Sequence, residues 1–191
     1  MSMRVVGGRA RGHPLKRVPG DTTRPIMDRV KENLFNIIGH DVMGSTWLDM
    51  FAGTGAVGIE ALSRGAAAAL FLDLARLAVR TIQDNLRSTR LQEGATVLRA
   101  DALAYVREYT GEPFDFIYIA PPQYRGLWHE ALAIVDARVD ALVDPYGQVI
   151  VQIDPKEYEP QALGSLILAD QRTYGSTMLC FYERDGEDEE E

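Results

Sequence analysis

The sequence predicts an α/β fold in which helices cover both faces of a mostly parallel sheet. From residue 46 onward, short apolar segments typical of strands alternate with segments of helical periodicity. Such alternation builds right-handed βαβ units, whose parallel strands are covered on both faces. A glycine-rich loop follows the first strand, and acidic residues or prolines follow the next three, as expected where ligands bind at the carboxyl ends of strands.

The individual elements follow from these patterns. We expect strands at residues 46–51, 68–73, 95–99, 114–119 and 147–153, and helices near 57–64, 75–88, 101–107 and 127–140. Two further apolar runs, near 163–169 and 176–183, are separated by only a short connection, which predicts a hairpin at the edge of the sheet.

The N-terminal region is predicted to be a small extension of this domain. Residues 3–6 and 13–18 have strand character and flank a glycine- and arginine-rich segment, which indicates a hairpin. Asp21-Thr22-Thr23 suits a helix N-cap, with Pro25 in the first turn of a helix that runs to about Ile38. We therefore expect residues 1–39 to form the extension and 40–184 the main domain, with 185–191 a disordered acidic tail.

Charge is distributed unevenly along the chain. The net charge is −8, yet residues 1–31 contain eight Lys or Arg and only two acidic residues, a local charge of +6. A basic end on an acidic body favours contact with a polyanion such as RNA, although a solvated charged face is an equally good explanation. The basic residues expected at such a contact are Arg4, Arg9, Arg11, Lys16, Arg17, Arg24 and Arg29.

Composition also excludes several classes of protein. No apolar run approaches the roughly 20 residues of a membrane helix, and the polar, basic N-terminus does not resemble a signal peptide. The one cysteine, Cys180, excludes an internal disulfide framework and a multi-cysteine metal site, and its apolar neighbours predict a buried side chain. We expect a cytoplasmic protein without a metal or a membrane partner.

The segment from Leu48 to Gly58 predicts a strand, a tight loop and the start of a helix. The spacing of its three glycines, Gly53, Gly55 and Gly58, matches the dinucleotide-binding pattern G-x-G-x-x-G. This pattern also permits an NAD-dependent oxidoreductase or a plain structural turn. Asp49 distinguishes the possibilities, because a carboxylate there would crowd a pyrophosphate but would suit the amino group of S-adenosylmethionine (AdoMet). A missing second substrate domain also disfavours the oxidoreductase.

Acidic residues follow the second and third strands. Asp73 lies 20 residues after Gly53, where a carboxylate could accept hydrogen bonds from both ribose hydroxyls. Its alternative role is to cap the next helix. Asp101 could cap a helix, accept a hydrogen bond from an adenine amino group, or do both.

The fourth strand ends in Ala120-Pro121-Pro122-Gln123-Tyr124. Two prolines stop the strand and stiffen the loop at the predicted ligand edge. Tyr124 and Trp128 could stack on a flat ring. By itself the segment is better explained by a structural turn with aromatic residues in the core.

Together these segments resemble the class I AdoMet-dependent methyltransferases, and in particular the RsmD-like bacterial enzymes that methylate a guanine N2 amine in small-subunit (16S) ribosomal RNA. The resemblance covers about residues 3–182 and is carried by the stretches RVVGG (4–8), TRP (23–25), RVKENLFN (29–36), DMFAGTG (49–55) and EALSRGA (60–66). It implies a Rossmann-like fold, AdoMet as cofactor, and ribosomal RNA in an assembling small subunit as partner.

The resemblance also implies roles for individual residues. The methionine part of AdoMet would be held by Asp49, Phe51, Ala52, Gly53, Thr54, Gly55 and Gly58, the ribose by Asp73, and the adenine by Asp101 and Ala102. The N-terminal basic residues would grip RNA phosphates. The catalytic loop would be Ala120, Pro121, Pro122, Gln123 and Tyr124, with Tyr124 stacking on a target base that has been turned out of its helix.

One position departs from the family pattern. The family has Asp-Pro-Pro-Tyr, or a close variant, where this chain has Ala120 and an additional Gln123 before the tyrosine. The missing side chain would accept a hydrogen bond from the target amine. Asp115 lies five residues earlier, roughly 16 Å away in a regular strand. The Pro121 carbonyl and the Gln123 side-chain oxygen remain as acceptors. An alternative is therefore an AdoMet-binding ribosome-assembly factor with weak or no catalysis.

Overall fold

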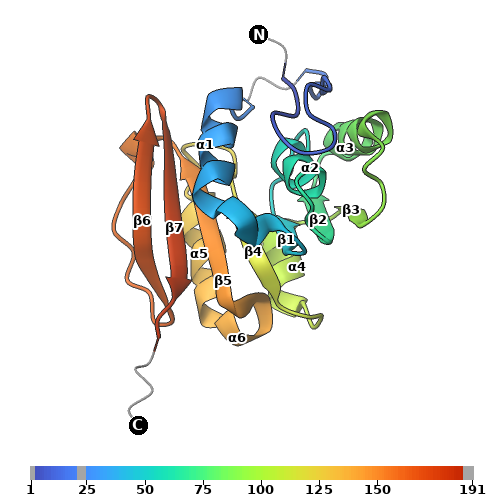
Figure 1. Cartoon of the computed structure of the whole chain (residues 1–191). Coiled ribbons are helices and arrows are strands. Elements are labelled where there is room, and N and C mark those ends of the chain that lie inside the picture. The colour runs from blue at the N-terminus through green and yellow to red at the C-terminus, as the bar shows by residue number, and fades with distance from the viewer. Residues whose placement is uncertain (1–2, 21–24, 187–191) are drawn as a thin grey trace.

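The computed structural model describes residues 3–20 and 25–186 of the 191. Its centre is a seven-stranded sheet of order β3-β2-β1-β4-β5-β7-β6, with helices on both faces (Figure 1). The parallel strands are β1 (Thr46–Asp49), β2 (Ala68–Asp73), β3 (Ala95–Arg99), β4 (Phe114–Ile119) and β5 (Val143–Ile153). The antiparallel hairpin is formed by β6 (Leu166–Tyr174) and β7 (Thr177–Arg184). The predicted Rossmann-like fold is confirmed.

The sheet separates two hydrophobic cores, each of which is covered by helices. One core contains residues of α1 (Asp28–Ile38), α2 (Ala56–Ser63) and α3 (Arg76–Thr89). The other contains residues of α4 (Ala102–Glu108), α5 (Leu127–Ala137) and α6 (Val139–Leu142). Short 3-10 helices, η1 (Gly39–Val42) and η2 (Pro155–Glu157), complete the described elements. Successive strand residues alternate between the cores: Trp47 lies in the first and Leu48 in the second, as the pleat requires.

Three main-domain elements differ most from the prediction: one helix, strand β5, and strand β6, which spans Leu166–Tyr174 instead of about residues 163–169. The helix expected over 127–140 is interrupted at Arg138, which is non-helical, and continues as α6. The Arg138 guanidinium donates to the carbonyls of Val106 and Tyr109, so long-range contacts fix this break. Strand β5 begins at Val143 instead of residue 147, because Val143 pairs with Phe114 across an irregularity in the ladder.

The N-terminal hairpin expected over 3–18 is wrong in detail. The structure has a single antiparallel bridge between Arg4 and Pro14 in place of two strands. Backbone bonds from Val5 to His13 and from Leu15 to Met3 nevertheless bring the two halves together. Proline lacks the N–H that a regular ladder needs. We call residues 3–20 the N-terminal arm.

Helix α1 begins later than expected, at Asp28, and Met27 at its N-cap provides no side-chain cap. The start near Pro25 was therefore wrong, and the predicted Asp21-Thr22-Thr23 cap lies outside the described residues. The end at Ile38 is confirmed, with Gly39 in the left-handed region at the C-cap. Most of the predicted acidic tail, residues 187–191, also lies outside the described part.

The carboxyl ends of the parallel strands share one edge of the sheet. In Figure 1, β7 runs down to the C-terminus, so its antiparallel neighbour β5 and the other parallel strands end at the top, near the arm. Within the described ranges, no helix is long and apolar enough to cross a bilayer. In the same ranges no group of three potential metal ligands occurs.

Candidate active site

The glycine loop connects β1 to α2 at this edge. Gly53 and Gly55 have φ values of 56° and 78°, a conformation that glycine adopts without a steric cost. The Ala52 N–H donates to the Leu72 carbonyl at 2.9 Å, which ties the loop to the end of β2. A Cβ on Gly58 would lie 2.3 Å from the Phe71 ring, so this glycine allows α2 to pack closely on the sheet.

Asp49 ends β1 directly below this loop and is almost completely buried, with 2% of its surface exposed. Its Oδ1 has no hydrogen-bond partner among the described residues. Burial, followed by the nearby charge of Asp73, raises the pKa of Asp49 to about 7, although the backbone N–H groups of Gly58 and Phe51 oppose the shift. A buried polar atom without a partner is rare and costly, and a cationic ligand would satisfy it.

Asp73 at the end of β2 holds the loop in place. Its Oδ2 accepts a hydrogen bond from the Gly53 N–H at 2.9 Å, and its Oδ1 accepts one from the Ala75 N–H at 2.8 Å. Each carboxylate oxygen has a second lone pair, so these bonds leave acceptor capacity for a ribose. The ribose role remains a prediction.

Asp101 caps α4, because its Oδ1 accepts a hydrogen bond from the Ala104 N–H at 2.9 Å. The capping role is thus confirmed. Asp101 is exposed and its neighbour Ala102 is buried. Contact of either residue with an adenine remains a prediction.

The loop after β4 lies at the same edge of the sheet. Ala120 is half-buried and packs against the core on the α1 side, Pro121 is buried, and Pro122 and Gln123 are exposed. Tyr124 is 64% exposed and has a left-handed φ of 59°, a strained conformation for a residue other than glycine. Trp128 is only 2% exposed and belongs to the core around α5, so its predicted stacking role was wrong.

Two carboxylates hold Tyr124 in this conformation. The Tyr124 backbone N–H donates to Glu157 of η2, and its hydroxyl donates to Asp154 Oδ2 at 2.9 Å. The backbone N–H of Lys156, followed by the Tyr124 hydroxyl, lowers the pKa of Asp154 below its usual value. Neither acid is among the site residues predicted from the sequence. Asp154 follows β5 directly, so the rule that selected Asp73 and Asp101 could have found it.

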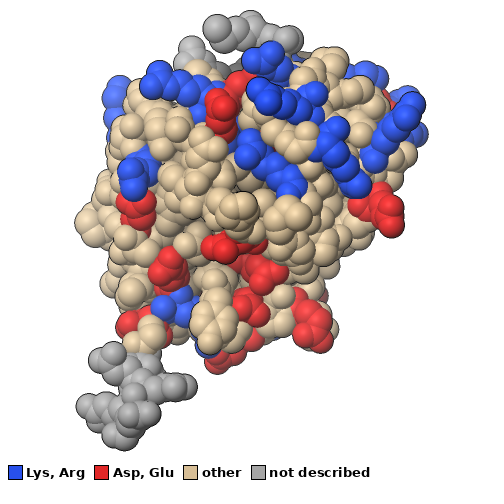
Figure 2. Space-filling model, in the orientation of Figure 1, with Lys and Arg blue, Asp and Glu red and all other residues tan. Residues whose placement is uncertain are grey.

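The basic residues lie near the same edge of the sheet. Figure 2 shows Lys and Arg side chains gathered over the upper part of the molecule and acidic side chains mostly below. Arg9 and Arg11 are exposed, as are Arg17 and Arg29. Arg4 pairs with Asp28 at 3.1 Å and Lys16 with Asp84 at 3.5 Å. Arg24 lies outside the described residues.

A buried ion pair joins the arm to the main domain. Lys31 of α1 and Glu60 of α2 have fully buried side chains, and Lys31 Nζ lies 3.2 Å from Glu60 Oε2. Lys31 Nζ also donates to the Arg4 carbonyl at 2.6 Å, and Glu60 Oε2 accepts from the Val6 N–H at 3.0 Å. Arg64 bonds to Glu60 Oε1 at 2.9 Å. The charges therefore bind the arm through its backbone.

Asn85 of α3 contacts both the arm and the glycine loop. Its Oδ1 accepts from the Lys16 N–H at 2.7 Å. Its Nδ2 donates to the carbonyls of Lys16, at 3.1 Å, and of Thr54, at 2.9 Å. The side chain is fully buried, so these bonds replace its contacts with water.

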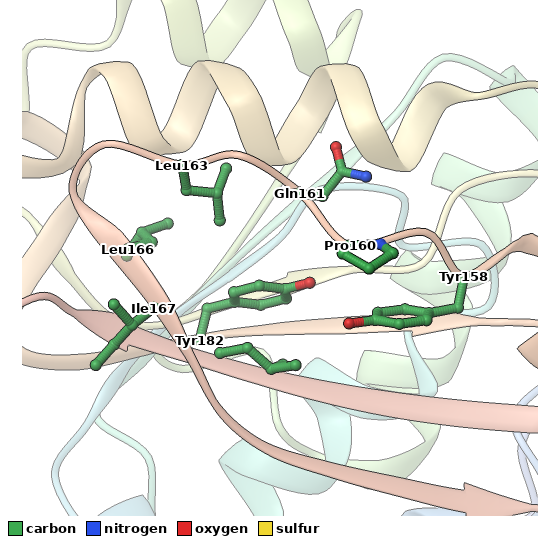
Figure 3. A pocket seen from close by; sticks show the side chains of 8 residues that line it. Tyr158, Pro160, Gln161, Leu163, Leu166, Ile167 and Tyr182 are labelled. Carbon is green, nitrogen blue, oxygen red and sulfur yellow. The ribbon is translucent and has the colours of Figure 1, made fainter.

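A cavity of about 350 Å³ lies elsewhere, between the segment after η2 and the β6–β7 hairpin (Figure 3). Its wall is mostly apolar and aromatic, and it consists of Tyr158, Pro160, Gln161, Leu163, Leu166, Ile167, Leu168 and Tyr182. None of the predicted site residues lines it. The candidate site is instead the surface between the loops at the strand ends, where the orphaned carboxylate and the exposed tyrosine lie.

Related proteins match nearly the whole chain in sequence. A protein of Bacillus subtilis named "Putative rRNA methyltransferase YlbH" is 36% identical over 188 residues, which cover 96% of this chain and 100% of that protein. Ribosomal RNA small subunit methyltransferase D of Escherichia coli (strain K12) is 28% identical, with 98% of this chain and 92% of that protein covered.

Solved structures agree with these matches. An Escherichia coli structure titled "Putative methyltransferase yhhF" superimposes with a TM-score of 0.84 and 28% identity, covering 97% of this chain and 99% of that one. The family described as "Conserved hypothetical protein 95" matches residues 3–183. The chain therefore belongs to this family of RsmD-like methyltransferases, as its sequence motifs indicated.

Proposed function

We propose that this protein transfers a methyl group from AdoMet to the exocyclic N2 amine of a guanine in 16S ribosomal RNA, within an assembling small subunit. The observation that carries the proposal is Asp49, a buried carboxylate with an unpartnered oxygen directly below a glycine loop. An ammonium group would donate the hydrogen bond that this oxygen lacks. Family membership favours AdoMet over NAD for this loop, and the names of the relatives support ribosomal RNA as the substrate.

The residues at the strand ends fit the parts of AdoMet. Asp49 would hold the amino group, and the loop from Phe51 to Gly55, with Gly58, would follow the methionine part. Asp73 would accept hydrogen bonds from the ribose hydroxyls, while Asp101 and Ala102 would contact the adenine. The bound cofactor supplies a methyl group on a positively charged sulfur, which is already a strong electrophile.

The chain must then orient a poor nucleophile. The lone pair of a guanine amine is delocalised into the ring, so acceptors that draw its N–H bonds out of the ring plane favour attack. The Pro121 carbonyl and the Gln123 side-chain oxygen are acceptors on the catalytic loop. The rigid, exposed ring of Tyr124 offers a stacking surface for the target base. Positioning of this kind supplies much of the rate in such a transfer.

The arm provides the contact with RNA. Its exposed arginines lie at the edge of the sheet that carries the candidate site, so phosphates bound there would place a nearby base at Tyr124. Small subunits assemble in the cytoplasm, where this activity would be located.

Tritium transfer from labelled AdoMet to undermethylated small subunits tests the proposal. We expect incorporation into 16S RNA, with N2-methylguanosine as the labelled nucleoside. Label in a different nucleoside would contradict the proposed target. Tight AdoMet binding without any transfer at high enzyme concentration would favour the alternative of an assembly factor, which Ala120 alone suggests.

A further inference from the structure

Strand β5 lies beside Ala120, the position at which this chain lacks the carboxylate of the family pattern. Strand β5 runs parallel to β4, and the register pairs Tyr118 with Ile150 and Ile119 with Val151. One step further along both chains, Ala120 lies beside Gln152. Neighbouring strands are about 4.8 Å apart, so the side chains at these two positions are within reach of one another when they share a face.

Residues 120 and 152 do share a face. Tyr118 and Ala120 both pack with the core on the α1 side, which includes Ile150. Gln152 follows Ile150 by two residues and therefore points to the same side of the sheet. A direct contact confirms this orientation, since the Tyr118 hydroxyl donates to Gln152 Oε1. Gln152 is half-buried, at the carboxyl edge of the sheet.

The same face links Gln152 to the candidate cofactor site. Tyr118 pairs in register with Asp49 of β1 and with Ile150 of β5, two residues before Gln152, so Asp49, Tyr118 and Gln152 lie on one face of three adjacent strands. Burial, followed by the charge of Asp49, raises the pKa of Tyr118 well above its usual value. The phenol thus remains a donor and fixes the orientation of the Gln152 amide. A carboxamide oxygen has two lone pairs, of which Tyr118 uses one.

We propose that Gln152 Oε1 supplies the hydrogen-bond acceptor that orients the target amine, in place of the side chain missing at Ala120. This inference rests on the proposed function. During transfer, the nitrogen lone pair forms the new N–C bond while the bond from the methyl carbon to sulfur breaks, and its electron pair stays on sulfur. The nitrogen then releases its extra proton to water, because a carboxamide does not take it.

Single-turnover methyl transfer to small subunits tests this assignment. We expect Gln152→Leu, which keeps the size but removes the acceptor, to lower the rate on the order of 10²-fold, while AdoMet affinity remains unchanged. Gln152→Glu retains an acceptor and should stay within several-fold of wild type. Adding Ala120→Asp to Gln152→Leu should restore the rate at least about tenfold, since it returns an acceptor to the position across the ladder.

Gln148→Leu is the matched control. Gln148 lies on the same face of β5, four residues before Gln152, and its amide donates to Glu183 at 2.7 Å. Its substitution removes a similar hydrogen bond far from the site, so transfer should persist. Three results would overturn the inference: an unchanged rate in Gln152→Leu, a loss that Ala120→Asp does not restore, or a greater loss in Gln123→Ala than in Gln152→Leu. Wild type that transfers no methyl group would overturn the proposed function and this inference with it.

Discussion

At the scale of single residues, Asp49 shows a conflict between stability and binding. Its folded-state pKa of about 7 lies above the value of 3.8 that it has in an exposed chain. Folding therefore favours the protonated acid. The associated stability is complete below pH 4 and is lost as the pH rises through 7. At pH 8 the free protein contains a buried, ionised carboxylate that the backbone N–H groups of Gly58 and Phe51 compensate only in part, and a bound cation would compensate it further.

We predict that Asp49→Asn stabilises the free protein at pH 8 and weakens its binding of AdoMet. The gain in unfolding free energy has an upper limit of roughly 4 kcal/mol, and the loss of binding should be at least about 1.5 kcal/mol. Denaturant titration and calorimetry measure the two quantities. In wild type, AdoMet should bind more weakly below pH 7, because the carboxyl must lose its proton first. Equal affinity in wild type and variant would contradict the role of Asp49.

Some residues of the candidate site could be predicted from the sequence and others could not. The spacing of Asp49 from Gly53 was enough to select a carboxylate that the structure buries beside the glycine loop, and its contact with the cofactor remains a prediction. Gln152 was missed because its importance depends on strand register, which a local pattern does not contain. Asp154 directly follows β5 and could have been selected by its position, although its contact with Tyr124 could not have been predicted. The stacking role predicted for Trp128 was wrong, because the sequence around an aromatic residue beside a loop does not show which side of its helix faces the core.

At the scale of elements, the ion pair between Lys31 and Glu60 determines how the arm attaches to α1 and α2. Two fully buried charges are costly to remove from water, and each compensates the other. We predict that Glu60→Leu or Lys31→Met alone destabilises the protein by about 3–5 kcal/mol. Glu60→Leu leaves the buried Lys31 charge without its carboxylate, whereas Lys31→Met leaves Glu60 paired with Arg64, so the loss in Lys31→Met should be the smaller of the two. Denaturant unfolding provides the measurement.

The double variant is the control for this pair. Lys31→Met with Glu60→Leu should recover much of the loss, although the Arg4 carbonyl and the Val6 N–H would still lack their partners. Limited proteolysis should then cut the arm faster than in wild type. Additive losses in the double variant would mean that the two charges do not depend on each other.

The same attachment explains why the arm was harder to predict than the sheet. Apolar periodicity fixed the central strands within a few residues, because burial on two faces leaves little choice of residue. The arm has no such pattern. Its path depends on Glu60 and on Asn85, which lie 54 and 69 residues after the arm residues that they contact, and the two halves of the arm meet in a single bridge instead of a ladder.

At the scale of the whole molecule, the separation of charge defines which end meets RNA. We predict that neutralising Arg9, Arg11 and Lys16 to Gln weakens RNA binding and flattens its dependence on salt, because fewer counterions are released. AdoMet affinity should remain unchanged, since only the Lys16 backbone contacts Asn85. Filter binding over a range of salt concentrations tests this. The same number of Arg→Gln changes at Arg90, Arg107 and Arg184, toward the opposite edge of the sheet, is the control, and an unaltered slope in the arm variant would place the phosphates elsewhere.

Asn85 gives the two ligands a thermodynamic connection. One buried amide orders both Thr54 in the glycine loop and Lys16 in the arm, so a ligand that steadies one segment lowers the cost of ordering the other. Reciprocity then requires equal effects: S-adenosylhomocysteine should raise RNA affinity by the factor by which RNA raises the affinity for S-adenosylhomocysteine, about 5- to 150-fold in typical cases. In Asn85→Ala both factors should fall toward one, a result that titrations of each ligand with and without the other would show. Spent cofactor and RNA would then each favour retention of the other, so neither would leave the enzyme as readily while the other is bound.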